Sequence, residues 1–543
     1  MLKKLVDSYP VLTLCLIFLL ILLPNLEVLD VTIMEARNFI TAREMLTDNN
    51  WLLTTMNGEA RYEKPPLPTW LTAISAAFFG VKSVFAMRLP AALFVILLVV
   101  FVFKISRGLT QNNTFAFRNA LIAGSSFYII GIIIEAPWDI FTHGFMCVAI
   151  YFLFQFLEQK KFHVKYAFLA SLFIGCSFLS KGPVSLYALL LPFLLAYGFT
   201  FKYKPLPKKL IAIVSILVIS ILIGGWWYLY VRAYDPETFA AITEKETGNW
   251  SSYNVRPFYY YWSFFTQSGI WTIPAFISLI YPYLKSRVKN LKAYQFSLLW
   301  TLLAVILLSL IPEKKSRYLM PVLIPLSINI SFYINYLITE FKTLQDKRET
   351  LPVYFNFGLI GLIGIIYAFI VGWLLKDSME GYFLYFIISG LILFGIGILI
   401  FKNLRKKELL NVFYLTFGLF ATLLITALPL KNALISDTYK PISELKQQSD
   451  LNLYQFNYIA PEVIWQYGDK IPPIKLKDGS IEFPKEDTFG LLAIGISPKD
   501  AEYLQSLYQI EEQETFDLNQ VSSNSRQYKE RLQANYYILT KRH

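Results

Sequence analysis

Ionisable side chains collect at the ends of the apolar stretches of this chain, in one of two alternating sets of loops. That set holds Glu35, Arg37, Glu63, Lys64, Asp139, His143, Lys181, Lys314, Lys315 and Arg317. Charges at the level of a membrane are costly and usually serve a function. A carboxylate can accept a proton from a nucleophile, and bases can stabilise negative charge on a leaving group. We therefore expect the chemistry of this protein at this face.

Glu35 stands at the start of a stretch with helical character, Met34–Leu46. An acidic residue in a first helical turn is favoured by the helix dipole, so Glu35 can be a capping residue. It can also be a functional carboxylate at the mouth of a membrane cavity. The residues leave both interpretations open.

The next charges, Arg61, Glu63 and Lys64, come directly before Pro65-Pro66. The two prolines keep Lys64 out of a helix and hold the neighbouring charges rigidly where the chain returns to the membrane. Lys64 can bind a phosphate as a point charge, or it can extend its ammonium group to the interface as lysines near membranes do.

Asp139 opens an apolar stretch, and His143 follows one helical turn later on the same face. Asp139 can be an ordinary helix cap. An Asp–His pair is a weak metal signal because metal sites usually need three or four ligands, and Glu63 is the candidate third ligand. A divalent metal is therefore possible, and no cofactor is required.

Bases in two further turns break the expected charge distribution of a membrane protein. They are Lys181, between two spans, and Lys314, Lys315 and Arg317, in the turn before Tyr318. The positive-inside rule concentrates bases in the opposite set of loops, so these exceptions need a reason. An anionic lipid head group or a diphosphate-like ligand would supply one.

The composition indicates an integral membrane protein. The chain has 543 residues, of which 55% are hydrophobic and 17% aromatic, and a net charge of +12. Positive-inside loops explain that charge better than nucleic-acid binding, because the bases lie in short loops between spans. The three cysteines lie in apolar spans and form no metal or disulfide pattern.

The apolar stretches predict about 13 transmembrane helices, since a span needs about 20 residues. They lie near 10–28, 88–105, 118–135, 139–157, 165–180, 183–201, 208–229, 262–284, 294–311, 318–338, 353–375, 381–401 and 408–428. The stretch Pro66–Phe79 is shorter, and we expect a juxtamembrane or re-entrant helix there. With that choice the basic loops fall inside, and the first outer loop, 29–87, falls outside. Lys3 and Lys4 precede an apolar run without a cleavage pattern, which indicates an uncleaved first helix with a cytoplasmic N-terminus.

The segment 430–543 differs from the rest of the chain. Its apolar density drops, turn signals such as Asp478-Gly479 appear, and β-like runs recur at Tyr454–Ile459, Gly490–Ile494 and Tyr536–Thr540. A helix-like stretch, Pro498–Ser506, lies between two of them. We expect a transmembrane domain over 1–429 and a small extracytoplasmic α/β domain over 430–543, with a cap or a stabilising role as its simplest function.

Several of these motifs, taken in order, resemble one family. They are Glu35-Ala36-Arg37, Ala42-Arg43-Glu44-Met45, Tyr62-Glu63-Lys64-Pro65-Pro66-Leu67, Asp139, Ser180-Lys181-Gly182-Pro183 and Lys314–Tyr318 followed by Leu319-Met320-Pro321. The chain resembles the aminoarabinose-transferase-like and protein O-mannosyltransferase-like glycosyltransferases of GT-C fold over about residues 10–340. The tail resembles only the family's habit of ending in an outer soluble domain.

The resemblance implies roles for these residues. The carrier phosphate would be held by Arg37, Lys64, Lys181, Lys314, Lys315 and Arg317, with help from Tyr318. Glu35 and Asp139 would bind or activate the acceptor nucleophile, and Glu63 matches a position associated with a metal. The family commonly has Asp-Glu where this chain has Met34-Glu35, so Glu35 takes the base role or the base lies elsewhere, with Asp30 in reserve. Residues 230–261 contain no histidine, which argues against a zinc site of the aminoarabinose branch.

The resemblance implies a glycosyltransferase of the bacterial inner membrane, with its C-terminal domain in the periplasm. It would move a sugar from a polyprenyl-phosphate carrier to a lipid A-type glycolipid or a protein, and nucleic acid is not an expected partner. A flippase or transporter of a lipid-linked sugar is the alternative. Transporters usually show internal repeats and interrupted helices at mid-membrane, and we find no internal repeat.

Overall fold

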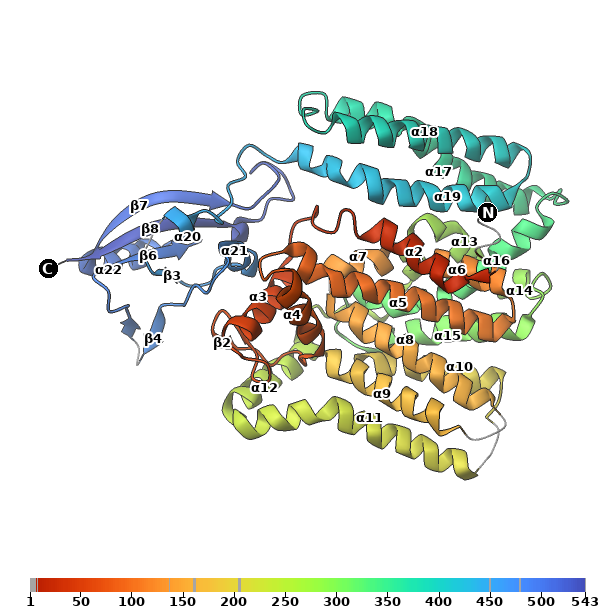
Figure 1. Ribbon diagram of the computed structural model, residues 1–543, viewed down its shortest axis with the longest axis horizontal. Helices are drawn as coiled ribbons and strands as arrows, with labels where there is room; N and C mark the ends of the chain where they lie inside the picture. Colours follow the sequence, from red (N-terminus) through yellow and green to blue (C-terminus); the bar gives the residue numbers. More distant parts are fainter. Residues whose placement is uncertain are drawn as a thin grey trace.

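The computed structural model describes residues 6, 8–135, 137–159, 163–203, 207–448, 451–477 and 480–542. The basic residues Lys3, Lys4, Lys160 and Lys161 and the expected turn at Asp478-Gly479 lie outside these ranges. The molecule is a bundle of helices with a smaller sheet domain at one end (Figure 1). The described N-terminal end of the chain lies toward the opposite end of the bundle.

Apolar helices make up the bundle. They are α2 (Pro10–Leu22), α5 (Val84–Thr110), α6 (Asn113–Gly124), α7 (Phe127–Glu135), α8 (Pro137–Glu158), α9 (Val164–Lys181), η1 (Leu186–Leu190), α10 (Leu191–Thr200), α11 (Pro207–Tyr234), η3 (Phe264–Trp271), α13 (Thr272–Ser278), α14 (Tyr281–Leu284), α15 (Leu291–Leu310), η4 (Ser316–Val322), α16 (Leu323–Glu340), α17 (Lys347–Leu374), α18 (Phe383–Arg405), α19 (Leu409–Thr422), η5 (Leu423–Ala427) and η6 (Leu428–Leu434).

The helices confirm a polytopic membrane domain. Within the described residues, nine helices are long and apolar enough to cross a membrane, or ten if the pair α6–α7, bent by 43°, is one span. The spans expected near 10–28 and 183–201 are shorter helical segments. The span expected near 262–284 is wrong as one continuous helix, because it is divided among η3, α13 and α14. Gly269 in this stretch has a φ of 65°, which an α-helix does not permit.

Short elements between α2 and α5, and after α11, form a layer at the end of the bundle that carries the sheet domain. They are α3 (Ile33–Thr47), β1 (Thr55–Met56), β2 (Glu59–Ala60), α4 (Leu67–Phe79), α12 (Pro236–Ser252) and η2 (Phe258–Tyr261). Helix α4 has 13 residues, which confirms the short helix expected there. Such a helix is too short to cross a bilayer alone.

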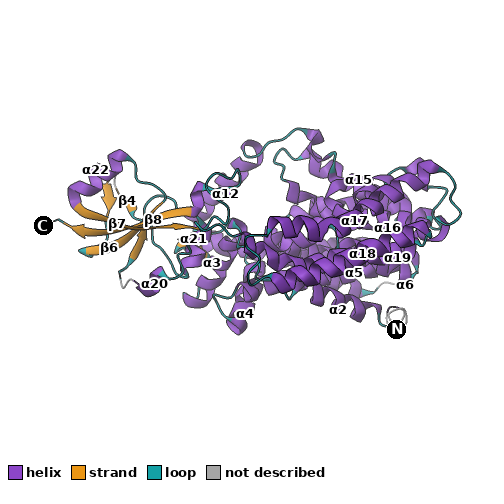
Figure 2. Cartoon of the chain, turned by 90° about the horizontal axis from the view of Figure 1, so that it is seen from above, coloured by secondary structure: helices purple, strands orange, loops and turns teal. Residues whose placement is uncertain are grey.

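The C-terminal domain is α/β, as expected. Its elements are α20 (Leu445–Gln448), β3 (Leu453–Gln455), α21 (Pro461–Tyr467), β4 (Lys475–Lys477), β5 (Ser480–Glu482), β6 (Thr488–Ala493), α22 (Pro498–Leu507), β7 (Tyr508–Asp517), η7 (Glu530–Leu532) and β8 (Gln533–Lys541). The main sheet has the order β3-β6-β8-β7, with β3 parallel to β6 and the other pairs antiparallel (Figure 2). The edge strand β7 was not expected, because its acidic residues hide the alternation of a strand.

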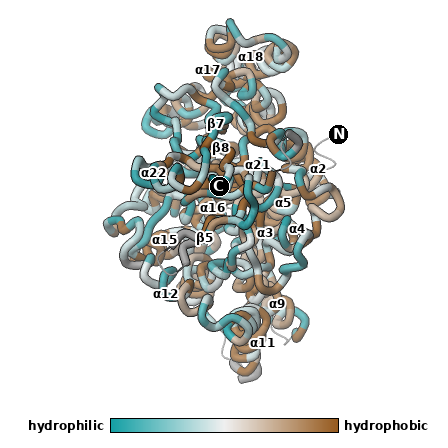
Figure 3. The backbone as a smooth tube through the Cα atoms, turned by 90° about the vertical axis from the view of Figure 1, so that its left-hand side faces the viewer, coloured by the Kyte–Doolittle hydropathy of each residue, from teal (hydrophilic) through white to brown (hydrophobic). Residues whose placement is uncertain are grey.

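The C-terminal domain is joined to α3 by one hydrophobic cluster. Ala36, Phe39 and Ile40 of α3 share it with Val463 and Ile464 of α21. Figure 3 faces this end of the molecule and shows α3 and α21 side by side. The helix that begins the first outer loop is therefore part of the core beneath the C-terminal domain.

Candidate active site

An ion pair between two bundle helices lies at the end that carries α3 and α4. Asp139 is in the first turn of α8, and Lys181 is the last residue of α9; the Lys181 ammonium contacts the Asp139 Oδ1. The ammonium nitrogen also lies 5.1 Å from the centre of the Tyr318 ring in η4. Two consecutive helices and the distant η4 thus bring a carboxylate, a cation and a phenol together.

A second group of charges comes from the first outer loop. The guanidinium of Arg61 lies 5.0 Å from the ring centre of Trp138, next to Asp139. It donates to the Arg37 carbonyl at 2.8 Å and to the Thr41 hydroxyl at 2.9 Å, and it lies 3.8 Å from the Glu63 carboxylate. Burial lowers the pKa of Arg61 to about 10, and the Glu63 charge opposes that shift. Arg61 therefore ties the loop to α8.

Lys64 is held between the loop and α12. Its ammonium lies 3.2 Å from the Glu246 carboxylate. The preceding Tyr62 donates its hydroxyl to Asp235, the N-cap of α12, at 2.9 Å, and its ring packs against Trp227 of α11. Hydrogen bonds from Thr238 and Tyr62 lower the pKa of Asp235. The rigid geometry expected before Pro65 is thus supported by contacts on both sides.

Polar atoms without partners mark this region. Buried atoms that have no hydrogen-bond partner among the described residues include Arg37 Nε, Glu63 Oε2, Trp138 Nε1, Asp139 Oδ2, His143 Nδ1 and Arg317 Nε. Buried polar groups in proteins are normally satisfied by protein or ordered water. The contacts among Arg61, Trp138, Asp139, Lys181 and Tyr318 link most of these residues into one neighbourhood. This neighbourhood can receive a polar ligand.

Glu35 lies elsewhere and is engaged in a structural contact. Its carboxylate accepts from Arg88 Nε at 2.7 Å and Arg88 Nη2 at 3.0 Å, and it forms a capping box with Thr32. Both side chains are almost completely buried. Burial raises the pKa of Glu35, and the Arg88 guanidinium opposes that rise. Both carboxylate oxygens are occupied, so this geometry offers no free oxygen for an acceptor proton and favours the capping interpretation. Asp30, the reserve candidate, is bound by Lys431 at 2.6 Å and by Gln520.

The contacts of Lys314 also argue against its expected role in holding the carrier phosphate. It is buried, and its ammonium donates to the carbonyls of Ile311 at 2.5 Å and Arg256 at 3.0 Å. Burial lowers its pKa. The neighbouring Lys315 contacts Glu313 at 2.6 Å, and Tyr318 donates to the same carboxylate at 3.2 Å. Lys314 therefore fastens two loops together, while Arg317 keeps a buried nitrogen without a partner.

Among the described residues, Asp139, His143 and Glu63 do not form a group that could hold a metal ion. Among the described ranges, no group of three or more His, Cys, Asp or Glu side chains is placed to hold a metal ion. His143 follows Asp139 one helical turn later in α8, and its Nδ1 has no hydrogen-bond partner among the described residues.

An apolar hollow begins beside Lys181. It has a volume of about 540 Å³ and lies between α9 and α11, and its lining residues are Phe178, Pro183, Ile221, Leu222, Gly225, Trp226, Tyr228 and Leu229. Ile221, Leu222 and Leu229 are more than half exposed on the outside of the bundle. Sequence reasoning missed this hollow, although Gly225, which has no side chain, within an apolar helix was a signal for it.

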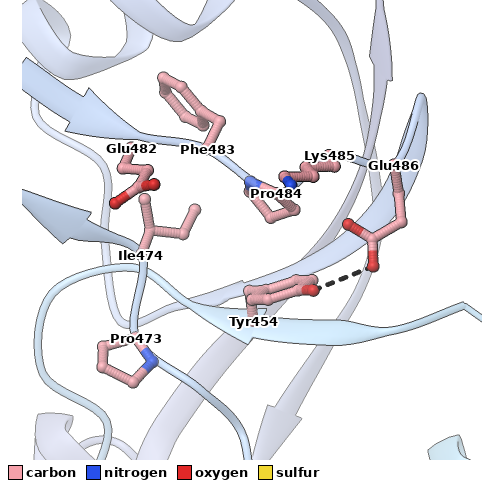
Figure 4. Close-up of a pocket in the computed structure, with 8 residues that line it drawn as sticks. All are labelled: Tyr454, Pro473, Ile474, Glu482, Phe483, Pro484, Lys485 and Glu486. Carbon is pink, nitrogen blue, oxygen red and sulfur yellow. Dashed lines mark hydrogen bonds between the residues drawn. The ribbon is translucent and has the colours of Figure 1, made fainter.

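A second hollow belongs to the C-terminal domain. It measures about 400 Å³, and Tyr454, Phe483 and Glu486 are among its lining residues (Figure 4). The Tyr454 hydroxyl donates to Glu486 at 3.1 Å. None of the residues expected to do chemistry lines it, so the ion-pair region remains the candidate site.

The same chain matches known membrane glycosyltransferases. Residues 63–227 match the family model of dolichyl-phosphate-mannose-protein mannosyltransferase. The chain is 26% identical over 399 residues to undecaprenyl phosphate-alpha-4-amino-4-deoxy-L-arabinose arabinosyl transferase 1 of Proteus mirabilis, which covers 70% of each protein. It is 26% identical over 302 residues to an uncharacterized protein of Aquifex aeolicus, which covers 54% of this chain and 58% of that one.

The fold is that of a solved protein. The crystal structure of ArnT from Cupriavidus metallidurans bound to undecaprenyl phosphate superposes with a TM-score of 0.66 over 97% of both chains, at 14% sequence identity. That likeness confirms the expected fold, including the C-terminal domain within the matched length.

Proposed function

We propose that this chain moves a sugar from a polyprenyl-phosphate carrier to an acceptor at the outer face of the cytoplasmic membrane. It belongs to the aminoarabinose-transferase-like family of GT-C-fold glycosyltransferases. The observation that carries the proposal is the buried Asp139–Lys181 pair, which lies beside the loop bases and next to the apolar hollow. The arrangement offers a base, cations for a phosphate and a surface for a hydrocarbon chain within one region.

The carrier phosphate is the leaving group in this proposal. Lys64, Lys181, Arg317 and Arg37 surround the region with positive charge, and Arg37 and Arg317 keep buried nitrogens without partners among the described residues. Cations aimed at an oxygen on which charge develops lower the barrier to its departure. The polyprenyl chain lies in the hollow between α9 and α11, whose lining includes Phe178 and Pro183 on either side of Lys181 in the sequence.

Asp139 is the general base. Its Oδ1 contacts Lys181, and its Oδ2 has no partner in the described part of the chain, so that oxygen can accept a proton. The acceptor oxygen attacks the anomeric carbon and forms a new glycosidic bond. The bond from that carbon to the phosphate oxygen breaks, and the phosphate keeps the electron pair. Asp139 receives the acceptor proton, which gives a single displacement through an oxocarbenium-like transition state.

A lipid A-type glycolipid is the first acceptor to test, and a protein acceptor is the alternative. Two relatives that match 70% and 64% of this chain are named as transferases of 4-amino-4-deoxy-L-arabinose from undecaprenyl phosphate. The donor to test first is therefore the undecaprenyl-phosphate-linked aminosugar. The flippase alternative finds no support among these relatives, because they are named as transferases.

The proposed orientation places the N-terminus in the cytoplasm and the C-terminal domain in the periplasm of a bacterial inner membrane. Two observations support it. The expected inner loops carry the larger share of the bases. The C-terminal domain, α3, α4 and α12 gather at one end of the bundle, and the described N-terminal end lies toward the other (Figure 1).

The test uses purified full-length protein, a radiolabelled polyprenyl-phosphate sugar and lipid A as acceptor. We expect the wild type to label the acceptor, and Asp139→Asn to reduce the rate by about 10²–10⁴-fold, as for other general bases. Asp377→Asn is the matched control, because Asp377 is an exposed carboxylate on an outer loop. Movement of the donor across liposome membranes without transfer to any acceptor would contradict the transferase proposal and support the flippase alternative.

A further inference from the structure

Asn57 of the first outer loop pairs with the backbone of the C-terminal domain. Asn57 donates its Nδ2 to the Ile471 carbonyl at 2.7 Å, and its Oδ1 accepts from the Ile471 amide at 2.7 Å. Both residues are buried, and they are separated by more than 400 positions in the chain. A side-chain amide that pairs with both backbone groups of one residue imitates the pairing of neighbouring strands. This contact is therefore a specific clamp between two domains.

The clamp sits on the turn of a small hairpin. Strands β1 and β2 pair from Thr55 to Ala60, and Asn57, with a φ of 59°, and Gly58 form the turn. The carboxylate of Glu44 in α3 accepts from the Asn57 amide at 2.6 Å and the Gly58 amide at 3.2 Å. The turn is thus fixed from α3 on one side and from the C-terminal domain on the other.

The hairpin leads directly into the candidate site. Immediately after β2, the Arg61 amide donates to the Thr54 carbonyl at 2.8 Å, and the Thr54 hydroxyl donates to the Arg61 carbonyl at 2.5 Å. Arg61 then reaches Trp138, and Lys64 follows three residues later. A displacement of the hairpin turn would therefore be passed to the segment Arg61–Lys64.

Other contacts hold the two domains in the same register. Lys470, next to the clamp, pairs with Asp48 at 2.7 Å. The Phe39 ring of α3 packs edge-on against Trp465 of α21, with 5.1 Å between ring centres. These contacts bind the C-terminal domain to α3, and the Asn57 side chain pairs with the same domain at the hairpin turn.

We propose that Asn57 is a positioning residue through which the C-terminal domain holds Arg61 and Lys64 in place for the carrier phosphate. The kinetic consequence of this inference rests on the proposed function. The coupling between the two domains does not depend on that function. It assigns the C-terminal domain a part in donor binding instead of a separate activity.

The test is Asn57→Gly in the full-length protein. Glycine keeps the left-handed turn without strain and removes only the side-chain amide. Asn457→Gly is the matched control, since Asn457 is an exposed asparagine with a φ of 60° in the C-terminal domain. Two readouts are measured: amide hydrogen exchange of residues 59–64, and the KM and kcat for the polyprenyl-phosphate sugar.

We expect at least tenfold faster exchange of residues 59–64 in Asn57→Gly, a rise of about fivefold in the donor KM, and a kcat within twofold of wild type. Asn57→Asp keeps the bond from the Ile471 amide and loses the donor, so its exchange should fall between the two. Exchange equal to wild type in Asn57→Gly, or equal acceleration in Asn457→Gly, would overturn the inference. If the wild type transferred no sugar, the proposed function would fail while the exchange experiment still decided the coupling.

Discussion

The ammonium of Lys181, at the end of α9, holds one oxygen of Asp139, at the start of α8, and leaves the other oxygen without a partner among the described residues. The pair has a simple consequence for chemistry. Lys181 fixes the carboxylate in place, and under the proposed function the second oxygen would receive the acceptor proton. A carboxylate fixed in this way needs no rearrangement before it accepts a proton, which is a general source of catalytic power.

Lys181, which is partly buried, and Lys314, which is buried, should respond differently to replacement by methionine. Lys181→Met removes a cation from the site, and we expect kcat/KM to fall by at least tenfold. Lys314→Met leaves the carbonyls of Ile311 and Arg256 without a donor. That loss should cost about 1–3 kcal/mol of stability and leave the donor KM near wild type. Thermal unfolding and the kinetics of both variants check these expectations. An unchanged unfolding temperature with a raised donor KM in Lys314→Met would show that Lys314 binds the carrier phosphate.

Glu35 should matter for stability and little for chemistry. Glu35→Gln leaves the buried Arg88 without its charge partner, which typically costs about 3–5 kcal/mol. The double variant Glu35→Leu/Arg88→Met removes both charges, so it should be less destabilised than the sum of Glu35→Leu and Arg88→Met. Thermal unfolding in detergent measures these three variants and Glu35→Gln, with turnover per folded molecule recorded beside it. Loss of turnover in a fully folded Glu35→Gln would make Glu35 the base after all.

The apolar hollow should accept part of the carrier chain. A Cβ atom added at Gly225 meets only ordinary contacts, 3.9 Å from Ile221 and Phe178, so a side chain can be introduced at this lining residue, and Gly225→Leu adds apolar bulk to the hollow. We expect its KM to rise several-fold for a long polyprenyl donor and to stay unchanged for a short-chain donor. Gly395→Leu is the control, because the added atoms there meet open space on α18. An equal effect on both donors would place the chain elsewhere.

Arg61 should require the planar shape of its guanidinium. It donates to the Arg37 carbonyl and the Thr41 hydroxyl while it covers Trp138, and a lysine cannot reproduce that set of contacts. We therefore expect Arg61→Lys to lower kcat/KM by about tenfold or more. Arg256→Lys, the same change at an exposed outer position, should leave kcat/KM within twofold. Wild-type kinetics in Arg61→Lys would show that its positive charge alone suffices.

Local signals predicted the elements that carry the site. The periodicity of Met34–Leu46 corresponds to α3, and Pro65-Pro66 with the apolar stretch behind them corresponds to α4. Both signals arise from residues that are close together in the sequence. The span expected near 262–284 failed because hydropathy does not register a helix break, although Gly269 lies within it.

The partners of the charges could not be predicted in the same way. Glu35 finds Arg88 at the start of another helix, 53 positions away, and Lys314 finds the carbonyl of Arg256. Which charges are satisfied internally depends on how distant segments approach one another. The order of spans and loops predicted that charges collect at one face, and only the fold separates the charges that pair within the protein from those with unpartnered atoms among the described residues.

The hollow between α9 and α11 lies open to the surrounding lipid, with Leu222 and Leu229 exposed at its rim. A carrier that occupies it can arrive sideways by diffusion in the plane of the bilayer and never has to leave the hydrocarbon. The supply of donor is then governed by its density per area of membrane. Dilution into detergent micelles should raise the apparent KM, and reconstitution into nanodiscs with a fixed mole fraction of carrier should restore it.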